Sequence, residues 1–314
     1  MKKILITGGA GYIGTVLANE LSLLSDVSEI VIYDNLMYKQ SGVFALLSNS
    51  KIKFIYGDVR EYDKFEKEIL KADVIFPLAA IVGFPACERD KQLASQINSK
   101  QIQFIMGAKS YHTKVILPNS NSGYGVGESG KLCTEESPLR PISAYGTTKC
   151  EGESYAIDGG AVALRLATVF GPSYRFRKDL LVNDFVQRAM VDKFIVLFEA
   201  SFKRNFIHIK DVVSAMILMM NNYEKYQGQV FNVGLSSANL SKMELCEKIK
   251  EQIPSFVIKT DDFAKDLDKR DYVVSNEKLE KTGWKAATSI EQGISELIKS
   301  LPVIIHTNTQ YTNL

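Results

Sequence analysis

The amino-acid sequence predicts an α/β fold, a doubly wound parallel sheet with a smaller C-terminal region partly interleaved with it. Through the first half of the chain, short apolar segments of strand character alternate with amphipathic helical segments. This rhythm is typical of βαβ units with helices on both faces of one sheet. After Gly171-Pro172 the alternation loosens. We therefore expect residues 1–170 to form the main domain, residues 171–306 a second, smaller region, and residues 307–314 a polar tail.

The strands are expected where short apolar runs lie between turn-forming residues. In chain order they are residues 3–7, 30–33, 52–56, 74–77, 115–117, 162–169 and 230–233. Between them, apolar residues recur at helical spacing, as at Ile13, Leu17 and Leu21. The helical ranges are 12–24, 62–71, 89–108, 145–156, 181–191, 212–222 and 242–252. Ser143 fits the N-cap of the helix that begins at residue 145.

Composition and charge exclude several classes of protein. A hydrophobic fraction of 46% and a charged fraction of 24% are ordinary for a globular chain. The net charge is +2 and no basic stripe stands out, so a nucleic-acid partner is not expected. No apolar run is long enough for a membrane helix or a signal peptide.

The four cysteines, Cys87, Cys133, Cys150 and Cys246, are far apart and form no CxxC pair. This spacing predicts neither a disulfide framework nor a metal site. Together with the composition, it indicates a cytoplasmic protein.

A glycine-rich turn, Thr7-Gly8-Gly9-Ala10-Gly11-Tyr12-Ile13-Gly14, joins the first strand to the first helix. Glycines let the backbone approach a pyrophosphate, and the helix N-terminus offers N–H groups and a positive dipole end. Glycines 8, 11 and 14 fit one dinucleotide-binding spacing and glycines 9, 11 and 14 fit another, so the register stays open.

Asp34 ends the second strand, 20 residues after Gly14. A carboxylate there accepts hydrogen bonds from the ribose 2′- and 3′-hydroxyls and repels a 2′-phosphate. The sequence thus predicts a Rossmann-type site for NAD rather than NADP.

Tyr145 and Lys149 stand at i and i+4 of a predicted helix, on one face. Oxidation of an alcohol needs a base for the hydroxyl proton, and a phenol serves only if its pKa is lowered. A neighbouring lysine cation favours the phenolate. The pair predicts a tyrosine base whose pKa is lowered by Lys149.

The combination of residues 7–14, Asp58-Val59, Leu78-Ala79-Ala80, residues 120–125 and residues 145–149 resembles the extended short-chain dehydrogenase/reductase family of nucleotide-sugar epimerases, dehydratases and dehydrogenases. The match runs from about residue 3 to residue 300. By this resemblance Asp58 and Val59 hold the adenine, and Asn98 takes a structural or cofactor-side position. The resemblance and the motifs together imply a cofactor set of Gly8, Gly11, Tyr12, Ile13, Gly14, Asp34, Asn35, Asp58, Val59, Leu78, Ala79, Ala80, Asn98, Tyr145 and Lys149.

The same resemblance implies that Ser120 aligns the sugar hydroxyl with Tyr145, with Ser122 as its nearest rival. Segments 165–172 and 204–212 match the nucleotide-sugar end of the family, in which Arg204 and Arg270 reach the diphosphate. Thr168 stands where many members have an asparagine, and Asn183 is an alternative substrate ligand. His208 is expected to be structural. The implied substrate set is Val82, Ser120, Asn121, Ser122, Thr168, Asn183, Arg204 and Arg270.

The choice of reaction depends on the two residues directly after Ser120. The family's 4,6-dehydratases have an Asp-Glu pair there, and Asn121-Ser122 cannot act as acid or base, so dehydration is disfavoured. The pattern around residues 81–87 and 119–149 resembles bacterial GDP-heptose 4-dehydrogenases, which act on GDP-D-glycero-α-D-manno-heptose in capsule polysaccharide biosynthesis, and we favour this activity. The alternative is a UDP-sugar 4-epimerase. A non-catalytic NAD(H)-binding regulator is disfavoured because Tyr145 and Lys149 are both present. The family resemblance further implies a homodimer through helices 89–108 and 145–156.

Overall fold

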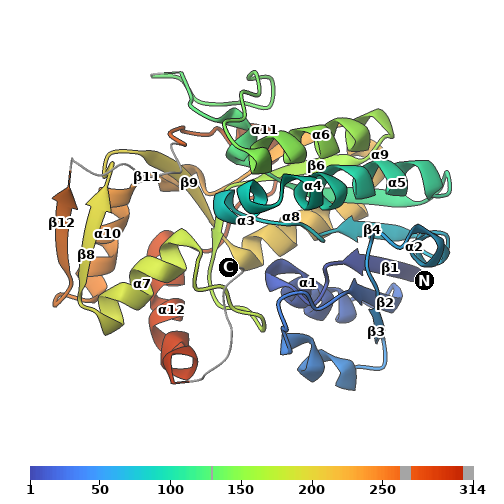
Figure 1. Cartoon of the computed structure of the whole chain (residues 1–314), viewed down its shortest axis with the longest axis horizontal. Coiled ribbons are helices and arrows are strands. Elements are labelled where there is room, and N and C mark those ends of the chain that lie inside the picture. Colours follow the sequence, from blue (N-terminus) through green and yellow to red (C-terminus); the bar gives the residue numbers. More distant parts are fainter. Residues whose placement is uncertain (129, 262–269, 307–314) are drawn as a thin grey trace.

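A parallel sheet forms the centre of the molecule (Figure 1). The computed structural model describes residues 1–128, 130–261 and 270–306. Within these residues seven parallel strands pair in the order β10-β6-β5-β4-β1-β2-β3. They are β1 (Lys2–Thr7), β2 (Val27–Asp34), β3 (Ile52–Tyr56), β4 (Val74–Pro77), β5 (Lys114–Ser120), β6 (Val162–Leu166) and β10 (Val230–Val233). The predicted doubly wound α/β fold is confirmed.

Helices cover both faces of this sheet because its central strands are apolar on both sides. In β1, Ile4 and Ile6 pack with α1 (Tyr12–Ser22) and α8 (Ile209–Asn221) on one face. Leu5 packs on the other face, in the core formed with α2 (Tyr62–Ile69), α5 (Gln101–Ala108) and α6 (Ala144–Asp158). The strand order reverses between β1 and β4, which creates a crevice at their carboxyl ends.

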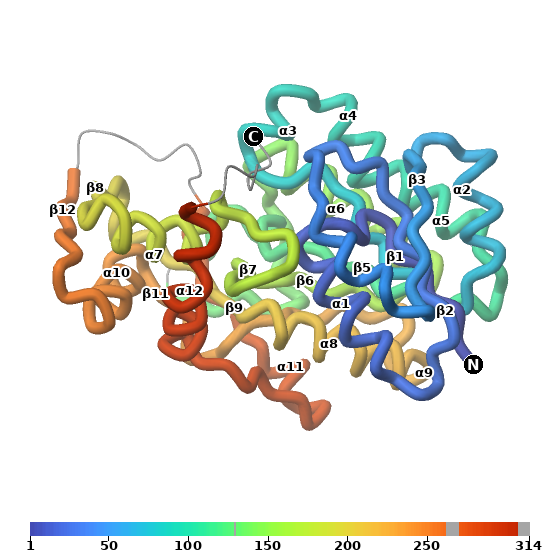
Figure 2. Tube along the Cα trace, turned by 90° about the horizontal axis from the view of Figure 1, so that it is seen from below, coloured from blue at the N-terminus to red at the C-terminus, as the bar shows by residue number. Residues whose placement is uncertain are grey.

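A smaller half lies beyond the carboxyl ends of the sheet strands and is built from later parts of the chain (Figure 1). It contains a sheet of β11 (Asn239–Ser241), β9 (Lys203–His208) and β7 (Thr168–Phe170), and a pair formed by β12 (Val257–Asp261) and β8 (Phe194–Phe198). Helix α12 (Ile290–Ile305) packs against α7 (Leu181–Val191) and α10 (Lys242–Gln252), as Figure 2 shows. The short helices α9 (Tyr223–Tyr226) and α11 (Glu277–Glu280) flank β10. Because α8 and β10 return to the main sheet, the C-terminal part is interleaved with the first half, as expected.

Two elements differ from the sequence-based expectation. The sequence predicts one strand over 162–169, but β6 ends at Leu166. The N–H of Ala167 still donates to the carbonyl of Val233 in β10 at 2.9 Å, and beyond it the chain leaves the main sheet. The following β7 then pairs with β9 in the other sheet. The expected helix over 89–108 is divided into α3 (Phe84–Arg89), α4 (Lys91–Ser95), a π-helical turn (Gln96–Lys100) and α5. Asp90 interrupts it by capping α4, since its carboxylate accepts from the N–H of Leu93.

In the ranges that the structure describes, none of the helices combines the length and the apolar character that a bilayer crossing requires. The expected polar tail, residues 307–314, lies outside the described residues.

Candidate active site

The glycine-rich turn after β1 forms one wall of a cavity at the crevice between β1 and β4. Gly8 has a φ of 65°, and a Cβ there would lie 2.6 Å from the Cα of Ala79, which follows β4. A Cβ on Gly14 would lie 2.6 Å from the Cα of Gly9. Gly8, Gly11 and Gly14 line the cavity, whereas a Cβ on Gly9 would meet the side chain of Ile32 on β2 at 2.9 Å and the carbonyl of Ile6 on β1 at 3.0 Å. The two glycine spacings of the sequence therefore serve two different contacts.

Helix α1 begins in this cavity without an anion of its own. Its N-cap is Gly11, which has no capping side chain, and its first turn carries no acidic residue. The backbone N–H groups and the positive end of the helix dipole remain available to a phosphate. Together with the missing Cβ atoms, this arrangement fits the pyrophosphate of a dinucleotide.

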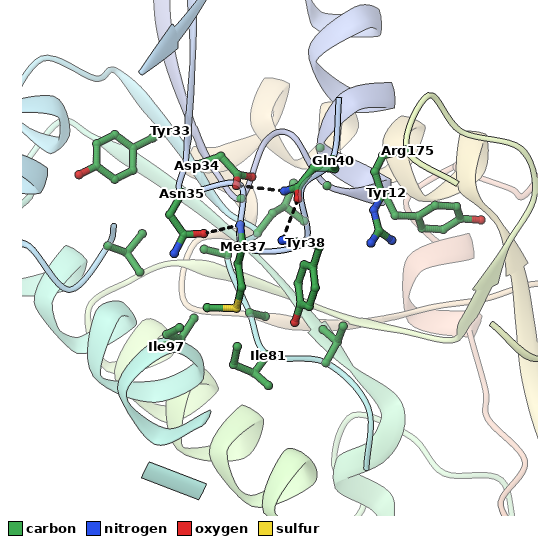
Figure 3. Close-up of a pocket in the computed structure, with 18 of the residues that line it drawn as sticks. Tyr12, Tyr33, Asp34, Asn35, Met37, Tyr38, Gln40, Ile81, Ile97 and Arg175 are labelled. Carbon is green, nitrogen blue, oxygen red and sulfur yellow. Dashed lines mark hydrogen bonds between the residues drawn. The ribbon is translucent and has the colours of Figure 1, made fainter. Parts of the chain in front are cut away.

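Asp34 lies at the end of β2 on the rim of the same cavity (Figure 3). Its side chain is buried and accepts hydrogen bonds from the N–H of Ala10 at 3.0 Å and of Leu36 at 2.8 Å. Burial raises the pKa of Asp34, and these two hydrogen bonds oppose the rise. This carboxylate is placed to accept a ribose hydroxyl, as the sequence predicts.

Asp58 closes the far end of the cavity. Arg60 donates to both of its oxygens, at 2.9 and 2.7 Å, and Asn35 donates to it at 3.1 Å. The Arg60 hydrogen bond is the main cause of a pKa lowered to about 2. Asp58 is therefore a permanent acceptor beside Val59, which suits an exocyclic amine.

All but three of the predicted cofactor residues line this cavity. They are Gly8, Gly11, Tyr12, Ile13, Gly14, Asp34, Asn35, Asp58, Val59, Leu78, Ala79 and Ala80. Tyr145 and Lys149 line the neighbouring cavity instead. Asn98 lines neither of these two cavities: its amide donates to the carbonyl of Ile81 and accepts from the N–H of Ile81, both at 2.9 Å. Its position supports the structural alternative, since it holds the loop after β4.

Among the lining residues that the sequence did not identify are five from two loops: Met37, Tyr38, Gln40, Arg175 and Arg177. They belong to two loops that no motif marks. The second loop comes from beyond β7 in the chain, so only the fold brings it to the cofactor side.

We expect Asp34→Ala to weaken NAD binding and to narrow the preference for NAD over NADP. The substitution removes an acceptor for the ribose hydroxyls and also removes the charge that repels a 2′-phosphate. Titration of the purified variant with each dinucleotide checks this. An unchanged ratio of the two dissociation constants would show that Asp34 does not contact the ribose.

A larger cavity of about 700 Å³ adjoins the cofactor crevice. The two share Tyr12, Ile13, Leu78, Ala80, Val82 and Arg177 in their walls. Seven of the predicted catalytic and substrate residues line it: Val82, Ser120, Tyr145, Lys149, Thr168, Arg204 and Arg270. The structure thus brings together residues that lie nearly two hundred positions apart.

The two predicted catalytic side chains, Tyr145 and Lys149, stand one turn apart on α6, which is capped just before them. The Oγ of Ser143 accepts from the N–H of Gly146 at 3.1 Å, which starts the helix at Ala144. Ser120 ends β5, and its hydroxyl is close enough to the phenol of Tyr145 to lower the pKa of that phenol. The same Oγ accepts from the N–H of Ser122 at 3.1 Å, so Ser120 caps a turn and also contacts Tyr145.

Burial and two neighbouring side chains have the largest effects on the pKa of Tyr145. Burial raises its pKa, while the hydrogen bond with Ser120 and the charge of Arg270 oppose the rise. The ammonium of Lys149 instead donates to the carbonyl of Pro118 at 3.1 Å. In this arrangement Ser120 and Arg270 favour the phenolate.

Burial lowers the pKa of Lys149 to about 8, although the charge of Glu153 opposes this. The folded protein therefore binds fewer protons at Lys149 than the unfolded chain does between about pH 8 and the ordinary lysine pKa of about 10.4. Stability rises with pH where the unfolded state binds more protons. We expect the wild-type protein to gain melting temperature relative to Lys149→Met across this range, with no such trend below pH 8. A constant difference at all pH values would contradict the lowered pKa.

Three predicted substrate residues do not line the larger cavity. Asn121 and Ser122 are buried in the turn after β5. Asn183 is fully buried, and its amide accepts from the N–H of Gly171 at 3.1 Å and donates to the carbonyl of Arg177 at 2.8 Å. The geometry makes Asn183 a brace for the loop after β7, and the adjacent Asp184 lines the cavity instead.

The wall that lies in the smaller half is basic and aromatic. Arg204 is buried at the start of β9, and its guanidinium lies 5.7 Å from the ring centroid of Tyr272. Arg270 and Lys242 belong to the same wall. His208 does not line the cavity: it caps α8 and packs on Phe170, in agreement with the expected structural role.

Known proteins resemble this chain over nearly its whole length. The low-salt glycan biosynthesis protein Agl12 of Haloferax volcanii is 27% identical, over 94% of this chain and 97% of that protein. The putative UDP-glucose 4-epimerase of Methanocaldococcus jannaschii is 25% identical, over 94% and 97% of the two chains. The crystal structure of UDP-glucuronic acid 4-epimerase from Bacillus cereus, in complex with UDP-glucuronic acid and NAD, superimposes with a TM-score of 0.84 at 23% identity, covering 96% and 99%.

The model of the NAD dependent epimerase/dehydratase family matches residues 4–234. This range includes the glycine turn, Asp34, Ser120, Tyr145 and Lys149. The cofactor is NAD, in agreement with the geometry around Asp34, and nucleotide sugars are the substrates of this class of enzyme. The chain belongs to the NAD dependent epimerase/dehydratase family.

Proposed function

We propose that this protein oxidises the C4 hydroxyl of a nucleotide sugar bound in the larger cavity. The observation that carries the proposal is the position of Ser120, Tyr145 and Lys149 on one wall of a cavity whose other wall carries Arg204 and Arg270. The sugar lies at Tyr145, and the diphosphate faces the arginines, because guanidinium groups bind phosphate oxygens in a bidentate manner.

Each residue of the catalytic set has one task in this proposal. Tyr145 accepts the proton of the C4 hydroxyl, and Ser120 holds that hydroxyl and the phenol in line. Lys149 places a cation beside the cofactor crevice. NAD, when bound, accepts the hydride from C4.

The fate of the keto-sugar separates two candidates. The first is a UDP-sugar 4-epimerase, in which the ketone is reduced again from its other face. The relatives favour it, since the M. jannaschii protein and the B. cereus enzyme are both described as 4-epimerases of UDP-linked sugars. A cavity of about 700 Å³ also gives a keto-sugar room to turn over.

The second candidate is a net 4-dehydrogenase of GDP-D-glycero-α-D-manno-heptose in capsule polysaccharide biosynthesis. It is supported by the likeness of residues 81–87 to such enzymes, because part of this segment (Val82, Gly83, Phe84, Pro85 and Ala86) lines the substrate cavity. A segment in contact with the sugar is where selectivity for a heptose would reside.

One experiment separates the two candidates. The enzyme is incubated with UDP-hexoses and with the GDP-heptose, while reduced nicotinamide is followed by absorbance and the product by NMR. Inverted C4 stereochemistry without net reduction of NAD identifies the epimerase. A 4-keto product with stoichiometric NADH identifies the dehydrogenase. If neither sugar class changes, C4 oxidation is wrong.

Arg204→Ala and Arg270→Ala are each expected to raise the KM for the nucleotide sugar far more than that for NAD. A lost hydrogen bond to a charged group is worth roughly 1.5–3 kcal/mol, or about ten- to hundredfold. Steady-state kinetics with each substrate varied in turn measures this. Arg140→Ala, a change on the surface away from both cavities, serves as the control. An unchanged KM would remove both arginines from the phosphate site.

Two further properties stay proposals. We infer a homodimer formed through α4, α5 and α6, as the family resemblance implies, and a cytoplasmic location. The four cysteines are all free thiols in the structure, which is consistent with a reducing compartment.

A further inference from the structure

Gln40 lies between Asp34 and the loop that follows β2, and no motif of the sequence marks it (Figure 3). Its side-chain nitrogen donates to Oδ1 of Asp34 at 3.1 Å, and its oxygen accepts from the N–H of Tyr38 at 3.1 Å. Gln40 is only 8% exposed, although it lines the cofactor cavity. Gln40 thus connects the carboxylate of Asp34, the expected acceptor for the ribose hydroxyls, with the backbone of the adjoining loop.

The orientation of this amide follows from its two partners. A backbone N–H can only donate, so it must face the amide oxygen, and an ionised carboxylate can only accept, so it must face the amide nitrogen. A carboxylate at residue 40 could satisfy Tyr38 but would meet Asp34 with a like charge. An apolar side chain would satisfy neither.

Gln40 changes what Asp34 can offer to a ligand. Oδ1 already accepts from the N–H of Leu36 and from Gln40, which occupies both of its lone pairs. Oδ2 accepts only from the N–H of Ala10 among the hydrogen bonds of the described residues, so one of its lone pairs is left. Asp34 therefore presents a single directed acceptor to the ribose rather than a freely rotating carboxylate.

The loop that carries Gln40 has an unfavourable backbone conformation that hydrogen bonds must stabilise. Leu36 has a φ of 52° and Lys39 a φ of 51°, in the left-handed region that residues with a Cβ seldom adopt. Conformations of this kind persist when the surrounding contacts over-determine them, and they concentrate at ligand sites. Here the contacts of Gln40 and the Leu36 N–H both converge on Oδ1 of Asp34.

We propose that Gln40 is the positioning residue of cofactor selectivity: its amide keeps Asp34 ionised and aimed with Oδ2 toward the adenosine ribose, so that NAD is accepted and a 2′-phosphate is rejected. Burial alone favours the protonated acid, and a protonated carboxyl would donate a hydrogen bond to a phosphate instead of repelling it. The hydrogen bonds that Asp34 accepts from Ala10, Leu36 and Gln40 favour the ionised carboxylate, so it remains an acceptor.

Other charged and titratable groups surround this carboxylate. From the loop after β7 come Arg175 and Arg177, from the end of β3 come Asp58 and Arg60, and the phenols nearby are Tyr12, Tyr33 and Tyr38. Arg175 favours the charged form of Asp34 through its own charge, and its guanidinium lies 5.6 Å from the ring centroid of Tyr38. These groups are the same in wild type and in the Gln40 variants. Their titration therefore affects both proteins alike, and the ratio of the two dissociation constants at each pH reports mainly on residue 40.

The test measures dissociation constants of NAD and NADP by calorimetry for wild type, Gln40→Met and Gln40→Glu, from about pH 5 to about pH 9. We expect Gln40→Met to weaken NAD binding about tenfold or more at every pH, the loss of a hydrogen bond to a charged group. We expect NADP binding to weaken less, so that the selectivity narrows.

Gln40→Glu provides the sharper readout because its result depends on protonation. Two carboxylates at one site cannot both ionise freely, so one of them retains a proton at low pH. When the introduced carboxyl is protonated, it donates to Asp34 as the Gln40 amide does, and NAD affinity near pH 5 is expected to approach that of wild type. Near pH 9 both groups are ionised, and the ratio of the variant and wild-type constants is expected to reach about tenfold or more.

Gln227→Glu, at an exposed position after α9, controls for the added charge and is expected to show no pH-dependent ratio. A ratio for Gln40→Glu that stays constant with pH would overturn the proposal, and so would wild-type selectivity in Gln40→Met. If Gln40→Met does not fold, the pH series of Gln40→Glu still decides, because each sample is its own reference. The test involves no sugar, so its failure leaves the proposed function untouched.

Discussion

Tyr145→Phe is expected to lose about 10²- to 10⁴-fold in turnover, the range that general acid–base catalysis contributes. The substitution removes only the hydroxyl, and with it the hydrogen bond to Ser120 and the acceptor for the substrate proton. Tyr145 lines the larger cavity rather than the cofactor crevice that contains Asp34 and the glycine turn. NAD affinity should therefore change little.

The pH dependence gives this prediction a second readout. Burial raises the pKa of Tyr145, so the phenolate needed for oxidation becomes more populated as pH increases. The wild-type oxidation rate should rise with pH on its acidic side, and the residual rate of Tyr145→Phe should lack this rise. Tyr111→Phe, at a side chain 93% exposed, is the matched control and should behave as wild type. Near-normal turnover of Tyr145→Phe would exclude Tyr145 as the base.

The sequence predicts the cofactor side of the molecule well because that side depends on short local patterns. The glycine turn and Asp34 are separated by one helix and one strand, and a βαβ unit leaves little freedom in how they meet. The periodicity of the flanking segments then supplies the sheet and its covering helices. The predicted cofactor residues of the turn, Gly8, Gly11, Tyr12, Ile13 and Gly14, all line the cavity.

The substrate side is less predictable because it is assembled from distant loops. Asn183 and Asp184 are adjacent on α7, and only the helix orientation decides that Asp184 faces the cavity while Asn183 braces Gly171. Gln40 and Arg175 meet at the cofactor crevice from two loops without regular periodicity. Periodicity in the sequence predicts which residues share a face of one helix or strand. It does not predict how loops from different parts of the chain meet.

Arg165 lies in a segment that the sequence analysis singled out, and its role in the structure is structural. The sequence places it in a segment that matches the nucleotide-sugar end of the family, but it lines neither of the two adjoining cavities. Its guanidinium is buried and forms three hydrogen bonds with Glu153, at 2.6 to 3.1 Å, and one with the hydroxyl of Tyr124 at 2.9 Å. Burial lowers its pKa, but the hydrogen bonds and charge of Glu153 outweigh burial, so the pKa is raised overall.

This ion pair connects three elements of the catalytic scaffold. Arg165 belongs to β6 and Glu153 to α6, and Glu153 also accepts from the amide of Asn119 at 2.6 Å, next to Ser120 on β5. Breaking a buried pair by removing one partner leaves an uncompensated charge, which costs about 3–5 kcal/mol. We expect Arg165→Met to lower the free energy of unfolding by this amount, as measured by urea denaturation.

The free energy of unfolding should fall far more when one charge of the Arg165–Glu153 pair is removed than when both are removed. In the double variant Arg165→Met/Glu153→Leu no charge is left buried, so a large part of the stability is expected to return. Arg188→Gln, which breaks a half-exposed pair with Asp184, should cost at most about 1 kcal/mol. If Arg165→Met were no more damaging than Arg188→Gln, the pair would not hold β5, β6 and α6 together. The double variant would then be expected to match the sum of the two single changes, since groups that do not interact contribute additively.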